Sequence, residues 1–271
     1  MRGGRRMMRG FVLAGATAAL AAHGAHAFPG GTPDYQTDAA PFCAGCHSSR
    51  DSAALAGAGE RAEKEVAERK HIAVILSGQV GYGKLSESDR RTLAEQVRAL
   101  DEASSVTLKA PAVVKAGEVF QVQVRVTGGA GPVVGVGLVD RPHRWYARPV
   151  ASAGFLVSAP PEIIGADGKP RTKWLERRPA EAGRNISFVN VPGIESDAAA
   201  GKWDSAEVVF SLRAPVRPGT YPLAASYWYG TEKSTVLGYT TNAMGWKEPR
   251  GGIAGASGRV MFTPLQQIRV Q

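Results

Sequence analysis

The chain has 271 residues, of which 44% are hydrophobic and 21% are charged. This is the balance of a globular protein, and the length suffices for one large or two ordinary domains. The 33 basic and 24 acidic side chains give a formal charge of +9 at pH 7. Nothing beyond this modest positive charge indicates a nucleic-acid partner, so we expect none.

The first 27 residues have the pattern of a secretory signal peptide. Four arginines precede a short apolar run at residues 11–22, and Ala25 and Ala27 supply the small residues before a cleavage point at Phe28. The run is too short to span a membrane, and no later segment approaches 18 uninterrupted apolar residues. We therefore expect a periplasmic or secreted protein without a transmembrane segment after signal cleavage.

The remainder divides into two segments of opposite charge. Residues 28–104 carry 9 basic and 12 acidic side chains, a net charge of −3, whereas residues 105–271 carry 20 and 12, a net charge of +8. This contrast favours docking between the segments, or of the second segment to an anionic surface. Basic residues that merely solvate a sheet would produce the same contrast.

The pentapeptide Cys43-Ala44-Gly45-Cys46-His47 is the attachment signature of c-type haem. Each thiol adds to a haem vinyl group, and the following imidazole binds the iron. These are the only two cysteines in the sequence. A zinc site lacks a second ligand pair, a redox dithiol prefers a βαβ context, and a disulfide across two residues is strained. In this motif the chain resembles the c-type cytochromes, which implies one covalent haem c.

Two helices are predicted after this motif. Residues 59–76 are charged early and apolar late, as in a helix whose last turns enter a core. Ser86 is a good N-cap for a second helix, in which apolar residues recur on one face at Leu93, Val97 and Leu100. The second helix is similar to the one that closes many small c-type cytochrome domains over the haem edge. The resemblance implies a small all-α haem domain over residues 28–104.

The second axial position of the iron has one local candidate, because residues 28–104 contain no methionine. His71 lies 24 residues after His47 on an apolar helical face, so we expect it to bind the iron opposite His47. The alternative is a core-edge histidine that bonds to the backbone. Met244, in the second segment, is the rival ligand if the two segments fold onto each other.

From residue 105 onward the hydrophobic period changes to two, which predicts strands. Seven or more short strands separated by Gly/Pro turns are typical of an antiparallel β-sandwich. The strand candidates are Val119–Val126, Val133–Val139, Trp145–Arg148, Ile186–Val191, Ala206–Arg213, Thr220–Tyr229 and Arg259–Phe262.

Residues 218–225 resemble the turn and strand of bacterial immunoglobulin-like domains, which implies a tyrosine corner at Tyr221. The predicted fold class is thus α+β and multidomain, with an all-α cytochrome c-like domain followed by an immunoglobulin-like sandwich over residues 105–271. Residues 238–258 are expected to form a long irregular loop.

Two other candidate sites, one metal-binding and one aromatic, lie in the second segment. His143 and Trp145 are candidates for lining a site, but a single histidine does not define a copper or zinc centre. Tyr227, Trp228 and Tyr229 are able to form a sugar-stacking surface, although alternation places Trp228 opposite its neighbours, which favours ordinary strand packing.

These observations predict an exported monohaem c-type cytochrome that passes electrons to a redox partner protein. Cys43 and Cys46 bind the haem, His47 and His71 bind its iron, and the sandwich is a docking module. The protein is then an electron carrier and not an enzyme. One alternative is a haem enzyme or sensor with an open distal position for peroxide, nitric oxide or carbon monoxide. Another is a sandwich that binds a ligand and uses the haem as an electron relay.

Overall fold

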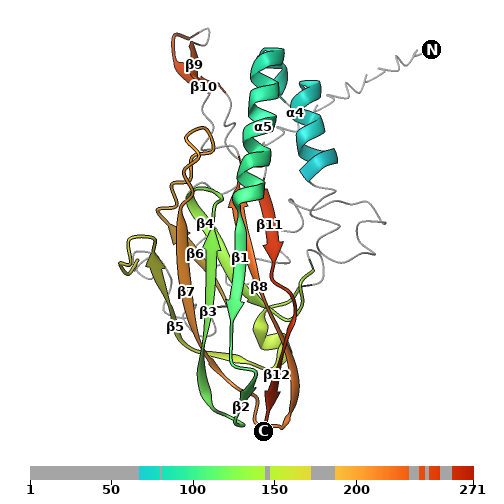
Figure 1. Cartoon of the computed structure of the whole chain (residues 1–271), viewed down its shortest axis with the longest axis vertical. Coiled ribbons are helices and arrows are strands. Elements are labelled where there is room, and N and C mark those ends of the chain that lie inside the picture. The colour runs from blue at the N-terminus through green and yellow to red at the C-terminus, as the bar shows by residue number, and fades with distance from the viewer. Residues whose placement is uncertain are drawn as a thin grey trace, which may run out of the picture.

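A short helical segment stands at one end of a β-sandwich (Figure 1). The predicted signal peptide, the haem motif and the first part of the first predicted helix lie outside the residues that the structure describes. None of the described helices is long and apolar enough to cross a membrane. The computed structural model describes residues 67–79, 81–143, 147–171, 187–231, 238–241, 244–250 and 258–271.

The sandwich consists of two mainly antiparallel sheets. The first has the strand order β1 (Ser105–Lys109), β3 (Val119–Thr127), β7 (Ser205–Arg213), β5 (Leu156–Gly165). The second has the order β2 (Val113–Val114), β12 (Gln266–Val270), β8 (Gly219–Gly230), β4 (Ala130–Val139), β6 (Phe188–Pro192), and β11 (Gly258–Phe262) extends it along β8. This is the immunoglobulin-like sandwich expected from the strand pattern.

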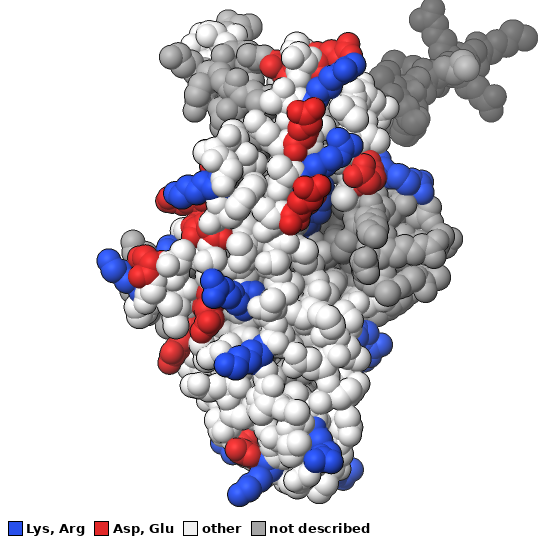
Figure 2. Space-filling view, in the orientation of Figure 1, with Lys and Arg blue, Asp and Glu red and all other residues white. Residues whose placement is uncertain are grey.

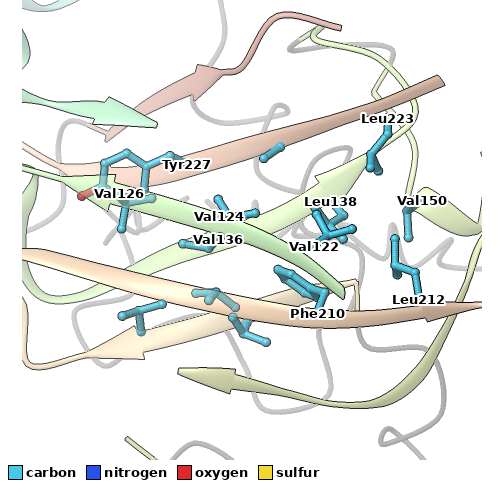
Figure 3. Close-up of a cluster of buried hydrophobic side chains, with 14 of the residues drawn as sticks. Val122, Val124, Val126, Val136, Leu138, Val150, Phe210, Leu212, Leu223 and Tyr227 are labelled. Atoms are coloured by element: carbon cyan, nitrogen blue, oxygen red, sulfur yellow. The ribbon is translucent and has the colours of Figure 1, made fainter. Parts of the chain in front are cut away.

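The core lies between the two sheets, and the alternating residues that were predicted to face inward do so. Along β3 the side chains alternate between exposed or half-buried and fully buried positions. Figure 3 shows the inward residues of β3 and β7 meeting those of β4 and β8. The labelled side chains are Val122, Val124, Val126, Val136, Leu138, Val150, Phe210, Leu212, Leu223 and Tyr227, all at most 1% exposed.

Strand β8 is buried on both faces, which accounts for its aromatic run. Tyr227 and Tyr229 face the main core, whereas Trp228 packs on the opposite face against Val139, Phe188 and Val260. The Trp228 indole also donates to Ser226 Oγ at 3.0 Å. Trp228 is 7% exposed, so its side chain packs within the protein and does not form a ligand surface, as alternation predicted.

Strand β5 and the hairpin of β9 (Gly238–Thr241) and β10 (Lys247–Arg250) were not predicted. The sequence of β5 contains Pro160 and Pro161, which lack the N–H group that a ladder needs. The structure tolerates them because β5 is an edge strand and because its pairing with β7 is irregular there. The hairpin replaces part of the irregular loop expected at residues 238–258.

One predicted strand is wrong in its described part. Residues 145–148 were expected to be a strand, but Ala147 and Arg148 have no strand pairing, and only an isolated bridge joins Val139 to Pro149. A short 3₁₀ helix, η3 (Val150–Ala153), follows. Arg148 N–H donates to the Asp140 carboxylate at 2.8 Å, and the Arg148 carbonyl accepts the Asp140 N–H at 2.9 Å, so Asp140 alone satisfies this backbone where a ladder was expected.

The predicted tyrosine corner is confirmed. The Tyr221 hydroxyl donates a hydrogen bond of 2.8 Å to the carbonyl of Arg217, four residues earlier. Its ring packs edge-on against Phe155 with a centroid separation of 6.0 Å. The corner therefore fixes the turn before β8 to the core.

The helical segment contains the π-helical turn η1 (Glu68–Ile72), α4 (Ala73–Ser77), the 3₁₀ turn η2 (Tyr82–Lys84) and α5 (Glu87–Ala103). Ser86 caps α5 as predicted, since its Oγ accepts the Asp89 N–H at 3.1 Å. Figure 2 shows acidic and basic side chains alternating along the exposed face of α5. Its opposite face and the residues before it form a separate apolar cluster of Ile72, Ile75, Tyr82, Leu85, Leu93, Ala94 and Val97.

Candidate functional site

His71 is the only member of the predicted haem-binding set that lies within the described residues, since Cys43, Cys46 and His47 fall outside them. It lies in η1, where the helical segment meets β11. The side chain is 4% exposed, which fits the prediction that it sits on a buried helical face. The elements around it bring together four polar residues that we call the junction cluster: His71, Asp101, Tyr229 and Arg259.

Both ring nitrogens of His71 have a polar neighbour. Nδ1 lies 3.0 Å from Nη2 of Arg259, and Nε2 lies 3.4 Å from the Tyr82 hydroxyl. A guanidinium has only donors, so Nδ1 must be the acceptor in its bond with Arg259. A neutral His71 ring therefore carries its proton on Nε2, the nitrogen that faces Tyr82.

This arrangement sets a condition for iron binding by His71. A metal-binding imidazole uses the lone pair of one nitrogen and usually donates the N–H of the other to an acceptor. In His71 the Nδ1 lone pair is directed at Arg259, which accepts no hydrogen bond. Ligation through Nε2 would move the proton to Nδ1, so His71 would have to separate from Arg259. Ligation of iron by His71 stays a prediction, with this rearrangement as its requirement.

Arg259 holds the junction cluster together. It lies on β11 opposite Tyr229 of β8, on the face directed toward the core. Its Nε donates to Oδ2 of Asp101 at 2.9 Å, and its side chain is 4% exposed. The carboxylate of Asp101 also accepts the Tyr229 hydroxyl at 3.0 Å. At the end of α5, the Asp101 carboxylate thus accepts hydrogen bonds from Tyr229 of β8 and from Arg259 of β11.

Asp101 occupies the last turn of α5, where the helix dipole disfavours a negative charge. The two donors from the sandwich offset this cost. Burial and the adjacent Asp101 carboxylate raise the pKa of Tyr229 well above its ordinary value, so Tyr229 remains a neutral donor. A second link lies beside it, because Ser104 Oγ donates to Leu100 O and accepts the Gly129 N–H at 2.9 Å.

The guanidinium of Arg259 is only partly satisfied. Nη1 is buried and has no hydrogen-bond partner within the part of the chain that the structure describes. A buried donor on a charged group without an acceptor costs about 1–3 kcal/mol or more. A carboxylate would fit this requirement, because a guanidinium binds carboxylates well. The cluster is therefore better suited to hold a carboxylate than to supply the iron ligand in its present state.

Met244, the rival ligand, lies between β9 and β10 and is 69% exposed. Figure 1 shows this hairpin well apart from α4, which follows His71 directly. His143 is half-buried, and Trp145 lies outside the described residues. Across the described ranges, no group of three or more His, Cys, Asp or Glu side chains is arranged to hold a metal ion.

Sequence reasoning did not find Asp101 or Arg259, and it considered Tyr229 only as part of an aromatic run. Two signals were present: an acidic residue in the last turn of a helix, and an arginine at an inward position of a strand. Each charged side chain would be unfavourable at its position alone, and the ion pair between Asp101 and Arg259 explains why both are present. Which residues pair cannot be read locally, because 158 positions separate Asp101 from Arg259.

Comparison with known proteins gives no family for this chain. No protein-family model matches it, and no curated protein matches it. Among solved structures, the CARDB domain of the PF1109 protein of Pyrococcus furiosus, in complex with di-metal ions, is 15% identical over 63% of this chain and 90% of that one, with a TM-score of 0.23. A PapD-like domain of human CEP192 is 11% identical over 62% and 85%, with a TM-score of 0.20. The fold assignment therefore depends on the sheets themselves.

Proposed function

We propose that the protein is an exported monohaem c-type cytochrome that transfers electrons to a redox partner protein. The observation that carries this proposal is the sequence Cys43-Ala44-Gly45-Cys46-His47, which contains the only cysteines in the chain. Cys43 and Cys46 would hold haem c covalently, and His47 would bind its iron. Bound haem would supply a one-electron iron couple. Residues 28–104 would form the haem domain, and the signal at residues 1–27 would direct it to the periplasm or cell exterior.

The described helices support this proposal by position and shape. The segment from η1 to α5 begins 21 residues after His47 and has one apolar face, with Leu93, Ala94 and Val97 fully buried. In its position after the motif, α5 resembles the helix that closes many small c-type cytochrome domains. In the carrier, His71 would fill the second axial position after leaving Arg259, so that no substrate reaches the iron. The sandwich would then serve as the docking module.

The hydrogen bonds of His71 favour a second candidate function. If His71 keeps Arg259 and Tyr82 as partners, the iron has no second ligand from the described helices. Peroxide, nitric oxide or carbon monoxide would then have access to it, and the protein would be a haem enzyme or sensor. The haem attachment is common to both candidates, and only the distal side differs.

The attachment is tested with the full chain, expressed with its own signal peptide in a host that matures c-type cytochromes. The wild type and a Cys43→Ser/Cys46→Ser variant are denatured, separated on a gel and stained for haem peroxidase activity. Covalent haem is expected in the wild type and not in the variant. Circular dichroism confirms that the variant contains its β-sandwich. A wild type without covalent haem, or a variant that retains it, would contradict the proposal.

A further inference from the structure

The end of the sandwich that lies opposite the helices exposes several aliphatic side chains (Figure 1). Val216, in the turn between β7 and β8, is 78% exposed. Val113, Val119 and Leu156 are 41%, 49% and 54% exposed. Single aliphatic residues are common on protein surfaces, so their meaning depends on whether they lie together.

The strand pairing brings these residues to the same end of both sheets. Val119 of β3 and Leu156 of β5 are the cross-strand partners of Arg213 of β7, so all three lie on the outer face of the first sheet. On the outer face of the second sheet, Val113 of β2 lies beside Arg269 of β12. Aliphatic side chains and arginines therefore alternate on both faces of this end.

The turn between β7 and β8 holds Val216 in solvent. The Gly117 N–H donates to the carbonyl of Pro215 at 3.2 Å, which joins this turn to the loop before β3. The carbonyl of Arg217 accepts the Tyr221 hydroxyl of the tyrosine corner. Pro215 and Pro218 fix the backbone on either side. Val216 would therefore lose little conformational freedom on binding.

The same end is basic. Lys115, Arg213, Arg217 and Arg269 are exposed, and none of them forms an ion pair with a carboxylate among the described residues. Glu118 is acidic, and its carboxylate accepts the Lys115 N–H at 2.6 Å. Figure 2 shows basic side chains gathered at this end. We use the name basic tip for Lys115, Arg213, Arg217 and Arg269 together with Val113, Val119, Leu156 and Val216.

The chemistry of the basic tip fits an anionic lipid surface. Aliphatic side chains enter the boundary between headgroups and acyl chains, while lysine and arginine are attracted to the lipid phosphates. Protein partners are bound mainly through tryptophan, tyrosine and arginine, and valine and leucine contribute less often. The four aliphatic residues of the basic tip are valines and a leucine, and they lie at a projecting end of the molecule. This combination favours a lipid surface over a protein.

We propose that the basic tip docks the protein end-on to an anionic lipid surface. Arg213 and Arg269, on opposite faces of the end, bind headgroup phosphates on the two sides of Val216, which enters the interface. The helical segment, at the other end of the sandwich, then points away from the lipid (Figure 1). This inference goes beyond the proposed electron transfer and does not depend on haem attachment.

The test measures binding of the purified full chain to vesicles by cosedimentation in about 0.1 M salt. Vesicles of equal parts phosphatidylglycerol and phosphatidylcholine are compared with vesicles of phosphatidylcholine alone. The wild type should bind the first and not the second. Lys115→Gln/Arg217→Gln should weaken binding about 25-fold, since each cation close to such a surface contributes a factor of about five. Val216→Ser should weaken it about tenfold.

Matched controls remove the same groups elsewhere. Lys84→Gln/Arg125→Gln removes two exposed cations, one in the helical segment and one six residues beyond Val119 on β3, about 20 Å away. Charges at that distance are screened at this salt concentration, so binding should change less than about twofold. Leu76→Ser, at an exposed position of α4, is the control for Val216→Ser. Circular dichroism shows that each variant is folded.

Three results would overturn the inference. Equal weakening by the two double variants would mean that net charge, and not the basic tip, causes binding. Equal binding to both kinds of vesicle would exclude a role for the cations. A wild type that binds neither kind would leave an acidic protein as the occupant of the basic tip. Each result leaves the haem attachment to be judged by its own gel.

Discussion

The carboxylate of Asp101 accepts Nε–H of Arg259 at 2.9 Å, and this ion pair joins α5 to β11 across 158 residues of sequence. The Tyr229 hydroxyl also donates to this carboxylate, and His71 accepts from the same guanidinium. The helical segment is therefore anchored to the sandwich by polar contacts as well as by Leu100, which belongs to the sandwich core.

Replacement of Asp101 by Ala should destabilise the protein strongly. It would leave the Arg259 cation, 4% exposed, without its counter-charge, and breaking a buried pair costs about 3–5 kcal/mol. We expect the lower end of this range because Asp101 is 23% exposed. Urea denaturation measures the change. Glu102→Gln, at the exposed neighbouring position, is the control and should alter the free energy of unfolding little.

The His71→Ala variant tests the second axial ligand. If His71 binds the iron, the haem-loaded wild type has a low-spin, six-coordinate spectrum without the near-infrared methionine–iron band and does not react with carbon monoxide. His71→Ala should then lose that spectrum and bind carbon monoxide. Tyr82→Phe removes only the hydroxyl near Nε2 and should leave the spectrum as it is. A His71→Ala spectrum identical to the wild type would refute the ligand assignment and favour the open distal site.

Alkaline titration should reveal two tyrosines that do not ionise with the rest. Burial raises the pKa values of Tyr227 and Tyr229 far above the ordinary value near 10, and the nearby carboxylates of Asp204 and Asp101 add to this. In the folded protein their phenolate absorbance should therefore be missing at the pH where tyrosines of ordinary pKa titrate.

The same two groups make stability depend on pH in the alkaline range. Their pKa values are higher in the folded than in the unfolded chain, so their contribution is complete below about pH 10 and declines as the pH rises above it. Urea midpoints measured from pH 9 upward should fall. Tyr227→Phe and Tyr229→Phe should each make the urea midpoint fall less steeply with pH. If neither variant changed this dependence, the two tyrosines would not be its cause.

The tyrosine corner should contribute modestly to stability. Tyr221→Phe removes one hydrogen bond to the Arg217 carbonyl, which lies near solvent, so we expect a loss of about 0.5–1.5 kcal/mol. Tyr227→Phe provides the comparison, because its fully buried hydroxyl donates to Gly128 O at 2.9 Å and its loss strands a buried carbonyl. Thermal denaturation of the two variants should give the larger loss for Tyr227→Phe. A larger loss of stability for Tyr221→Phe would contradict the conclusion that the Tyr227 hydroxyl is the more buried of the two.

Patterns that are local in sequence predicted much of the fold. The period-two alternation located β3, β7 and β8, and the Ser86 cap located the start of α5, because each depends on a few neighbouring residues. Strand β5 was missed because its prolines violate the local rule, and only its place at a sheet edge makes them acceptable.

The candidate site was predicted less completely. His71 was singled out by its position on an apolar helical face, and it does lie at a buried junction. Its partner Arg259 is 188 residues further along the chain, and no local pattern connects the two. The state of the imidazole, which nitrogen carries the proton and which accepts, follows only from that distant contact.

In the exported cytochrome proposed above, that separation would also order the events of maturation. The contact between His71 and Arg259 forms only after β11 has paired with β8, and contacts between residues so far apart in sequence form late in folding. In a chain that crosses a membrane from its N-terminus, the segment with the two cysteines emerges long before β11 does. For that proposed protein, the β-domain would leave an interval in which the thiols could meet haem before β11 completes the junction.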